Sequence, residues 1–348
     1  MDTKVLVGAA FWDRARQGMR TAGLFDLTVR SGEWKQVTGG LPEDVEVRCI
    51  AIRESGTIFV GTQDGPCRSD DGGRSWRLLE LPGVDRVVWS ILPCDPTILY
   101  VGTLGTSIYR SDDDGERWRQ LPVPVTAGAV EMGFPMRVIR LAVDPSDPET
   151  IYAAFEVGGI ARSLDGGETW TDCGEGLLEF AKEDRFKSQL LSDTETEGMM
   201  DSHAVAVSPS LPSTVFLANR MGLFRSPDRG DTWLAMDIGQ FSDLTYARDL
   251  KVFPHDPDTL LVALSDSSGG VVGSLYRSSD LGETWSRFDH DVSINSTLMT
   301  LAASIRTPER VYCAARRGQV FGTENAGQSW QSYPLPDGVE GVYAIACE

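Results

Sequence analysis

Short apolar runs alternate with polar, turn-forming segments along the whole chain, and few stretches have the spacing of a long helix. Ile58–Thr62 and Leu99–Thr103 are runs of β-branched and aromatic residues, which favour strands. Residues 151–154 form a similar run. A turn rich in Pro, Asp and Ser at 145–148 precedes it, and another apolar run at 139–143 precedes that turn. The pattern therefore predicts an all-β protein made of consecutive short strands.

A nine-residue phrase recurs along the chain and ends in tryptophan each time. The copies are RSDDGGRSW, RSDDDGERW, RSLDGGETW, RSPDRGDTW and RSSDLGETW, with worn copies GTENAGQSW and VRSGEW. Seven of the nine tryptophans occupy this position, and successive ones are 42, 42, 52, 63, 52 and 45 residues apart. Each unit of about 42 residues carries four strand signals, which is typical of a β-propeller blade. Seven units predict seven blades.

The two ends of the chain each supply part of one blade. Residues 341–347 resemble an inner strand with no second strand after it, and residues 4–9 resemble a second strand with no inner strand before it. We therefore expect an all-β, seven-bladed β-propeller, closed by pairing of its N- and C-terminal strands in one blade. Residues 1–348 would form a single domain. The longest spacing places an insertion at about 173–201, with helix-like spacing in part, which we expect over the central cup.

The phrase S-x-D-x-G-x-[S/T]-W resembles the Asp-box (BNR) repeat of sialidases, sortilin-type receptors, xyloglucan-cleaving hydrolases and a photosystem II assembly factor. A structural role accounts for its residues. The Ser163 hydroxyl and Asp165 carboxylate can bond turn amides, Gly167 can take a positive φ, and Trp170 can fill the space between sheets. The resemblance implies the propeller fold but no single activity, because enzymes, receptors and assembly factors share it.

Composition excludes several classes of partner. A net charge of −19 argues against nucleic acid and anionic membrane surfaces. No apolar run approaches the roughly 18 residues of a membrane span. The short apolar run at the N-terminus is followed by arginines, so we expect no secretion signal and a cytoplasmic protein. The six cysteines form no C-x-x-C pair, and no closely spaced ligand pair predicts a metal or another cofactor.

Candidate functional residues gather at the starts of inner strands and on the loops of the same face. As catalytic candidates the sequence offers Asp201, His203 and Glu131. The candidate ligand-binding residues are Arg137, Arg248, Tyr246, Trp89, Tyr343, Trp12, Arg20 and Arg220. Trp12 and Trp89 are the two tryptophans that the repeat does not explain, and arginine forks suit carboxylates.

Two functions remain open on the sequence. In the first, the propeller binds a small anionic or polyhydroxylated ligand, such as a carbohydrate or carboxylate, in its cup and acts as a glycosidase-like hydrolase or lyase. In the second, it is a non-catalytic scaffold that binds a protein or peptide. True sialidase activity is disfavoured, because the F/Y-R-I-P phrase of that family is missing near the N-terminus and residues 134–137 echo it only loosely. The oligomeric state cannot be read from the sequence.

Overall fold

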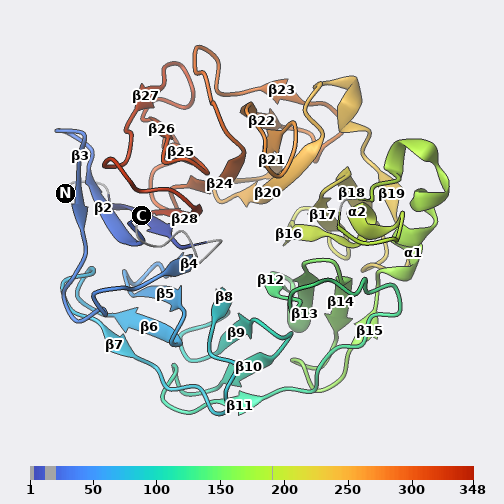
Figure 1. Cartoon of the computed structure of the whole chain (residues 1–348), viewed down its shortest axis with the longest axis horizontal. Coiled ribbons are helices and arrows are strands. Elements are labelled where there is room, and N and C mark those ends of the chain that lie inside the picture. Colours follow the sequence, from blue (N-terminus) through green and yellow to red (C-terminus); the bar gives the residue numbers. More distant parts are fainter. Residues whose placement is uncertain (1–3, 12–20, 190) are drawn as a thin grey trace.

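Seven antiparallel sheets of four strands each surround a central axis (Figure 1). The structure is a computed structural model that describes residues 4–11, 21–189 and 191–348. The chain runs round the ring in order, so that each blade is one stretch of sequence except for the blade that contains both ends (Figure 1). The predicted seven-bladed β-propeller is confirmed.

Blades 1 to 6 follow one another in the sequence, and each begins with its inner strand. Blade 1 comprises β4 (Val47–Ile52), β5 (Ile58–Thr62), β6 (Pro66–Ser69) and β7 (Arg77–Leu78). Blade 2 comprises β8 (Val88–Pro93), β9 (Leu99–Thr103), β10 (Ile108–Ser111) and β11 (Arg119–Gln120). Blade 3 comprises β12 (Val138–Asp144), β13 (Asp147–Phe155), β14 (Gly159–Ser163) and β15 (Thr171–Asp172).

The second half of the ring has the same design. Blade 4 comprises β16 (Ser202–Val207), β17 (Val215–Asn219), β18 (Gly222–Ser226) and β19 (Leu234–Ala235). Blade 5 comprises β20 (Tyr246–Phe253), β21 (Asp256–Ser265), β22 (Gly273–Ser278) and β23 (Ser286–Arg287). Blade 6 comprises β24 (Leu298–Ala303), β25 (Val311–Ala315), β26 (Val320–Thr323) and β27 (Gln331–Ser332).

Blade 7 closes the ring with strands from both ends of the chain. Its order is β28 (Val342–Cys347), β1 (Lys4–Ala9), β2 (Gly23–Thr28) and β3 (Glu33–Gln36). The inner strand β28 pairs antiparallel with β1, and Val5 lies opposite Cys347. Pairing the ends removes two free sheet edges that would otherwise attract other chains. The predicted closure is therefore confirmed.

The recurring phrase forms the corner between the third and fourth strands of a blade. In blade 3 the Ser163 hydroxyl accepts a hydrogen bond from the Gly167 amide at 2.7 Å and donates to Asp165 at 2.8 Å. Asp165 also accepts from the Thr169 amide and hydroxyl, at 2.8 and 2.6 Å. Gly167 has a φ of +96°, and Trp170 packs into the apolar cluster between blades 2 and 3. The predicted structural role of these residues is thus confirmed for this corner.

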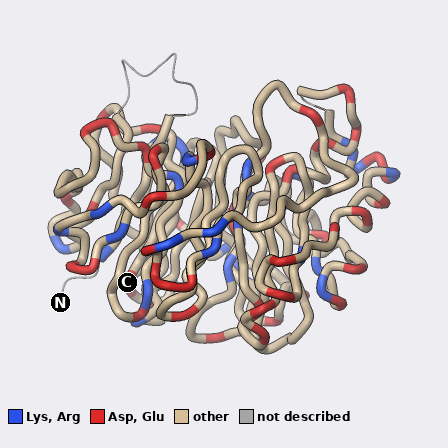
Figure 2. The backbone as a smooth tube through the Cα atoms, turned by 90° about the horizontal axis from the view of Figure 1, so that it is seen from below, with Lys and Arg blue, Asp and Glu red and all other residues tan. Residues whose placement is uncertain are grey.

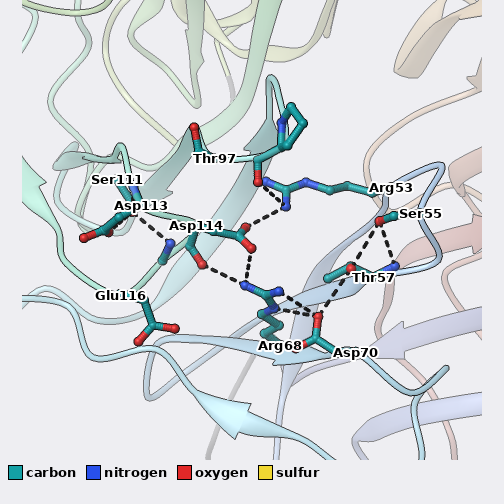
Figure 3. A network of polar contacts seen from close by, with 12 residues as sticks. Arg53, Ser55, Thr57, Arg68, Asp70, Thr97, Ser111, Asp113, Asp114 and Glu116 are labelled. Atoms are coloured by element: carbon teal, nitrogen blue, oxygen red, sulfur yellow. Dashed lines mark hydrogen bonds and ion pairs between the residues drawn. The ribbon is translucent and has the colours of Figure 1, made fainter.

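In blades 1 to 3 the arginine that precedes the corner serine connects its blade to the next one. Arg68 donates to the Asp114 backbone carbonyl of the next blade at 2.9 Å and to its carboxylate at 2.5 Å (Figure 3). Arg53 bonds the same carboxylate at 2.6 Å, so that Asp114 joins two arginines of blade 1 to blade 2. Arg110 and Arg162 reach the equivalent carbonyls of blades 3 and 4 at 3.1 and 2.9 Å. These arginines therefore link blades 1 to 4 on the corner face.

The inserted segment after Trp170 contains most of the helical structure. It includes α1 (Glu175–Leu178), η2 (Phe180–Lys182), η3 (Asp184–Phe186) and α2 (Glu197–Met200), and a further turn, η4 (Ile238–Gln240), follows blade 4. In Figure 1 α1 lies at the outer edge of the ring, beside β19. The rings of Phe180 and Phe186 pack on Phe224 of β18, with centroids 5.1 and 5.6 Å away.

This position differs from the expected lid over the cup. Leu177, Phe180 and Phe186 are apolar and find an apolar surface on the outer strands of blade 4, whereas the axial channel is polar and charged. Only the end of the segment, at Asp201, reaches the channel, where β16 begins.

Asp and Glu residues occur at turns on both faces of the disc, as the side view of the backbone in Figure 2 shows. This distribution agrees with the net charge of −19. Within the described ranges no helix is both long and apolar enough to cross a membrane.

Candidate functional site

Each inner strand has a β-bulge near its beginning, where the register with the second strand skips one residue. The register shifts fall between Val47 and Cys49 in blade 1 and between Ala247 and Asp249 in blade 5, and five further strands repeat them. A bulge re-aims the side chain of its extra residue. The seven skipped residues are Arg48, Trp89, Ile139, His203, Arg248, Met299 and Tyr343. All seven line one cavity of about 30 Å³ on the ring axis.

Trp89 is the aromatic centre of one side of this channel. The Arg137 guanidinium lies 4.4 Å from the centroid of its ring and that of Arg48 lies 5.3 Å away. Tyr343 packs edge-on against Trp89 with centroids 5.4 Å apart. Both arginines are thereby held over an aromatic face, where a cation is attracted by the ring quadrupole. Each also has a carboxylate partner: Glu46 pairs with Arg48, and Glu156 pairs with Arg137 at 2.7 Å.

Glu156 follows β13 and is buried beside Arg137. Its amide donates to the Arg137 carbonyl at 3.1 Å, so that backbone and side chain both fix its position. Burial raises the pKa of Glu156 to about 7, and Asp201 adds to the increase, whereas Arg137 and Arg248 oppose it. Glu156 is therefore a carboxyl group that exchanges its proton near neutral pH.

Asp201 forms the centre of a second group of buried polar side chains. Its Oδ2 atom accepts a hydrogen bond from Arg220 at 2.5 Å and lies 3.2 Å from His203 Nε2. Although burial opposes ionisation, the charges of His203 and Arg220 hold the pKa of Asp201 below its ordinary value. His203 Nδ1 lies 2.7 Å from the Ala247 carbonyl, and the Tyr246 hydroxyl lies 3.4 Å from Nε2. Burial lowers the pKa of His203, against the influence of Asp201.

Farther along the inner strands, charged residues from three blades meet across the axis. Arg140 of blade 3 donates to Asp249 of blade 5 at 3.0 Å. Asp249 also accepts from the Thr300 hydroxyl and the Leu301 amide of blade 6, at 3.1 and 3.0 Å. Lys251 lies two residues beyond Asp249 and lines the same cavity.

The structure brings together most of the residues that the sequence proposed. Trp89, His203, Arg248 and Tyr343 line the cavity directly. Arg137, Asp201, Arg220 and Tyr246 surround it through the contacts described above. Glu131 is exposed on the connection between β11 and β12, apart from this group. Trp12 and Arg20 lie outside the described residues.

Sequence reasoning missed several charged residues of the channel. They are Glu46, Arg48, Arg140, Glu156, Asp249 and Lys251. A usable signal existed for the inner-strand members, because a charged residue within a short apolar run such as VRCIAI has to face a polar space. Glu156 gave no such signal, since it stands in a turn beside two glycines. Among the described residues no three His, Cys, Asp or Glu side chains gather as metal ligands.

The fold defines the class of protein as a seven-bladed β-propeller with a charged axial channel. Residues 15–341 match the family described as the DUF6242 beta propeller domain, and the chain belongs to this family.

Relatives of known activity resemble only part of the chain or only its fold. Over 154 residues it is 25% identical to the xyloglucanase Xgh74A of Acetivibrio thermocellus, a match that covers 43% of this chain and 17% of that enzyme. The structure superposes on the GH74 xyloglucanase of Xanthomonas campestris with a TM-score of 0.63 at 17% identity, covering 88% of this chain and 47% of that one. It superposes on YCF48 bound to D1 peptide with a TM-score of 0.54 at 16% identity, covering 85% of both chains. At these identities the structural likenesses show the fold alone. The chain spans less than half the length of the xyloglucanases.

Proposed function

We propose that the mouth of the channel binds a small carboxylated or polyhydroxylated molecule, and that Glu156 and Asp201 supply acid and base chemistry to it. The observation that supports this function is the opposite behaviour of two carboxyl groups in one cluster. The pKa of Glu156 is raised to about 7, whereas that of Asp201 is lowered. Hydrolysis of glycosides uses such a pair, one carboxylic acid and one carboxylate.

The surrounding residues suit the same role. Arg248 lies close enough to influence both carboxyl groups and forms no ion pair with a described carboxylate, so its guanidinium is available to an anionic ligand. Trp89 and Tyr343 add aromatic surface on the opposite side. His203 orients Asp201, because its ring is fixed by the Ala247 carbonyl. The xyloglucanase relatives agree with a carbohydrate as the ligand.

A peptide is the second candidate ligand, and one observation favours it. The likeness to YCF48 bound to D1 peptide extends over 85% of both chains, whereas the xyloglucanase structure is about twice as long as this chain. The same arginines would then hold a carboxylate of the peptide, and Glu156 and Asp201 would serve only to position them.

We also propose that the corners are Asp-box repeats. The hydrogen bonds of Ser163 and Asp165 recur at the corresponding residues of blades 1, 2, 4 and 5, and blade 6 uses Thr323 and Asn325 in their place. Their position on the corner face separates them from the channel mouth and assigns them to the scaffold.

Thermal-shift and calorimetric titrations with sugar acids, glycosides, lactones and short acidic peptides test the function. The double variant Arg137→Ala, Arg248→Ala should lose the response of the wild type. The matched control is Arg74→Ala, Arg117→Ala, which removes the same charge from exposed corners.

A response to glycosides with product release, lost in Glu156→Gln and Asp201→Asn, supports the hydrolase. A response to peptides alone supports the second candidate. Equal responses in both double variants would refute a ligand at these arginines.

A further inference from the structure

The axial cavity lies farther into the ring than Glu156 and has its own set of charges. It holds about 30 Å³, which is room for one or two atoms of the size of a water molecule. Four cationic side chains line it, and no acidic side chain of the described residues does so. They are Arg48, Arg140, Arg248 and Lys251.

Among the described residues around the channel, two cations have no carboxylate within ion-pair distance. Four ion pairs match one arginine to one carboxylate each: Arg48–Glu46, Arg137–Glu156, Arg140–Asp249 and Arg220–Asp201. Arg248 and Lys251 pair within 4 Å with no carboxylate of the described residues. Both line the cavity. Both are half-buried, so each unpaired charge is only partly hydrated, and the site as described lacks negative charge.

Unused hydrogen-bond donors point to the same deficit. Arg48 is 8% exposed, and its Nε and Nη1 atoms are buried without an acceptor among the described residues. The Arg140 Nε atom is also buried without an acceptor among the described residues. Guanidinium and ammonium groups only donate, so they cannot satisfy one another. Burial also lowers the pKa of Lys251, with Arg140 adding to the decrease and Asp249 opposing it. A bound anion would accept hydrogen bonds from these donors and would balance part of the positive charge.

We propose that the axial cavity binds one small monovalent anion between Arg48, Arg140, Arg248 and Lys251. The volume admits a halide ion or a single carboxylate group and excludes a sugar ring. The anion would connect inner strands from blades 1, 3 and 5 and thereby stabilise the ring. This site shares Arg248 with the ligand proposed at the channel mouth, whereas Glu156 and Asp201 do not line the cavity. Lys251 takes no part in the proposed mouth site, so a change at Lys251 tests the anion site alone.

Crystals grown in sodium bromide test the site directly. Anomalous scattering at the bromine edge should give one peak on the ring axis, within hydrogen-bond distance of Lys251 Nζ or an arginine nitrogen. Thermal unfolding of the whole chain gives the second readout, with bromide or formate replacing the larger methanesulfonate ion, which carries no carboxylate, at constant ionic strength. We expect Tm to rise by about 2–5 °C in the wild type as the anion reaches 100 times its Kd.

Lys251→Met should abolish this rise, and Arg248→Gln offers a second variant if the first does not fold. Lys35→Met is the matched control, because Lys35 is exposed on β3 and loses the same charge. Stabilisation by bromide with an axial peak assigns the site to a free inorganic anion. Stabilisation by formate but not bromide assigns it to a carboxylate group. No peak together with equal Tm in bromide, formate and methanesulfonate would overturn the proposal, as would an undiminished bromide effect in both variants.

Discussion

Arg140 of blade 3 reaches across the axis to Asp249 of blade 5 and bonds it at 3.0 Å, passing the intervening blade. On the inner strand of that blade, Ala204 holds the register position that corresponds to Arg140 and Asp249, directly after the bulge. Asp249 is completely buried and also accepts from Thr300 and Leu301 of blade 6. This contact connects blades that are not neighbours in the ring, so it resists opening of the ring as a whole.

Replacing Asp249 by Asn should destabilise the protein by about 2 kcal/mol, since it removes one charge from the pair and leaves Arg140 partly buried without its partner. This loss in the free energy of unfolding is smaller than that expected for a fully buried ion pair, because about a third of the Arg140 side chain is exposed. Urea denaturation measures the loss. The double variant Arg140→Gln, Asp249→Asn should recover part of it. If the double variant loses as much free energy of unfolding as the two single variants together, the contact carries no coupling energy.

Gly167→Ala should destabilise blade 3 by about 2 kcal/mol or more. Its φ of +96° is unfavourable for residues with a side chain, and a Cβ atom would come within 2.4 Å of Leu121 Cδ1. Gly133→Ala is the matched control, because a Cβ atom at Gly133 meets no atom within 4 Å. Both are compared by urea denaturation. Equal stability of the two variants would contradict the structural role of the corner.

Acid should weaken the corners before it affects the rest of the ring. Hydrogen bonds from the Thr169 hydroxyl and amide lower the pKa of Asp165 to about 2, and those from Ser75 lower that of Asp71 as well. A lowered pKa in the folded state gives stability that is complete above the ordinary value of about 4 and is lost as pH falls through the folded value. Tm of the wild type should thus fall between pH 4 and 2. Asp165→Asn should have a lower Tm at pH 7 and a shallower fall in acid, and a parallel fall would contradict this.

The repeat made the fold predictable, whereas the site depended on bulges that the sequence does not reveal. Seven tryptophans at one position define seven blades, since each marks the same corner. The inner strands are different, because side chains alternate faces only while the register is regular. One bulge shifts every following residue to the other face. Without its position, the orientation of Arg48 or Lys251 in an apolar strand cannot be deduced.

Long-range contacts explain why the sequence revealed neither the role of Glu156 nor the position of the inserted segment. Glu156 acquires its role from Arg137, 19 residues away, and from Asp201 in the next blade. Neither interaction produces a recognisable pattern in the sequence around Glu156. The inserted segment had the spacing of a helix, but its packing depends on Phe224 of blade 4, whose buried ring contacts Phe180 and Phe186.

Glu156 should give the stability of the protein a dependence on pH near neutrality, opposite in sign to that of the corners. Burial raises its pKa from 4.5 to about 7, so the folded state holds a proton in this range that the unfolded state has released. The stability linked to this proton is complete below about pH 4.5 and is lost as pH rises through about 7. Its full size is about 3 kcal/mol.

Glu156→Gln keeps the shape of the side chain and removes the titration. Tm of the wild type should fall between pH 5 and 8, whereas Tm of the variant should change less and should exceed that of the wild type at pH 8. The difference between the two curves isolates Glu156, because every other titratable group is the same in both proteins. Glu131→Gln, a change at an exposed carboxylate on the neighbouring connection, is the matched control and should follow the wild type. Parallel curves for wild type and Glu156→Gln would place the pKa of Glu156 at its ordinary value and would remove the acid from the proposed pair.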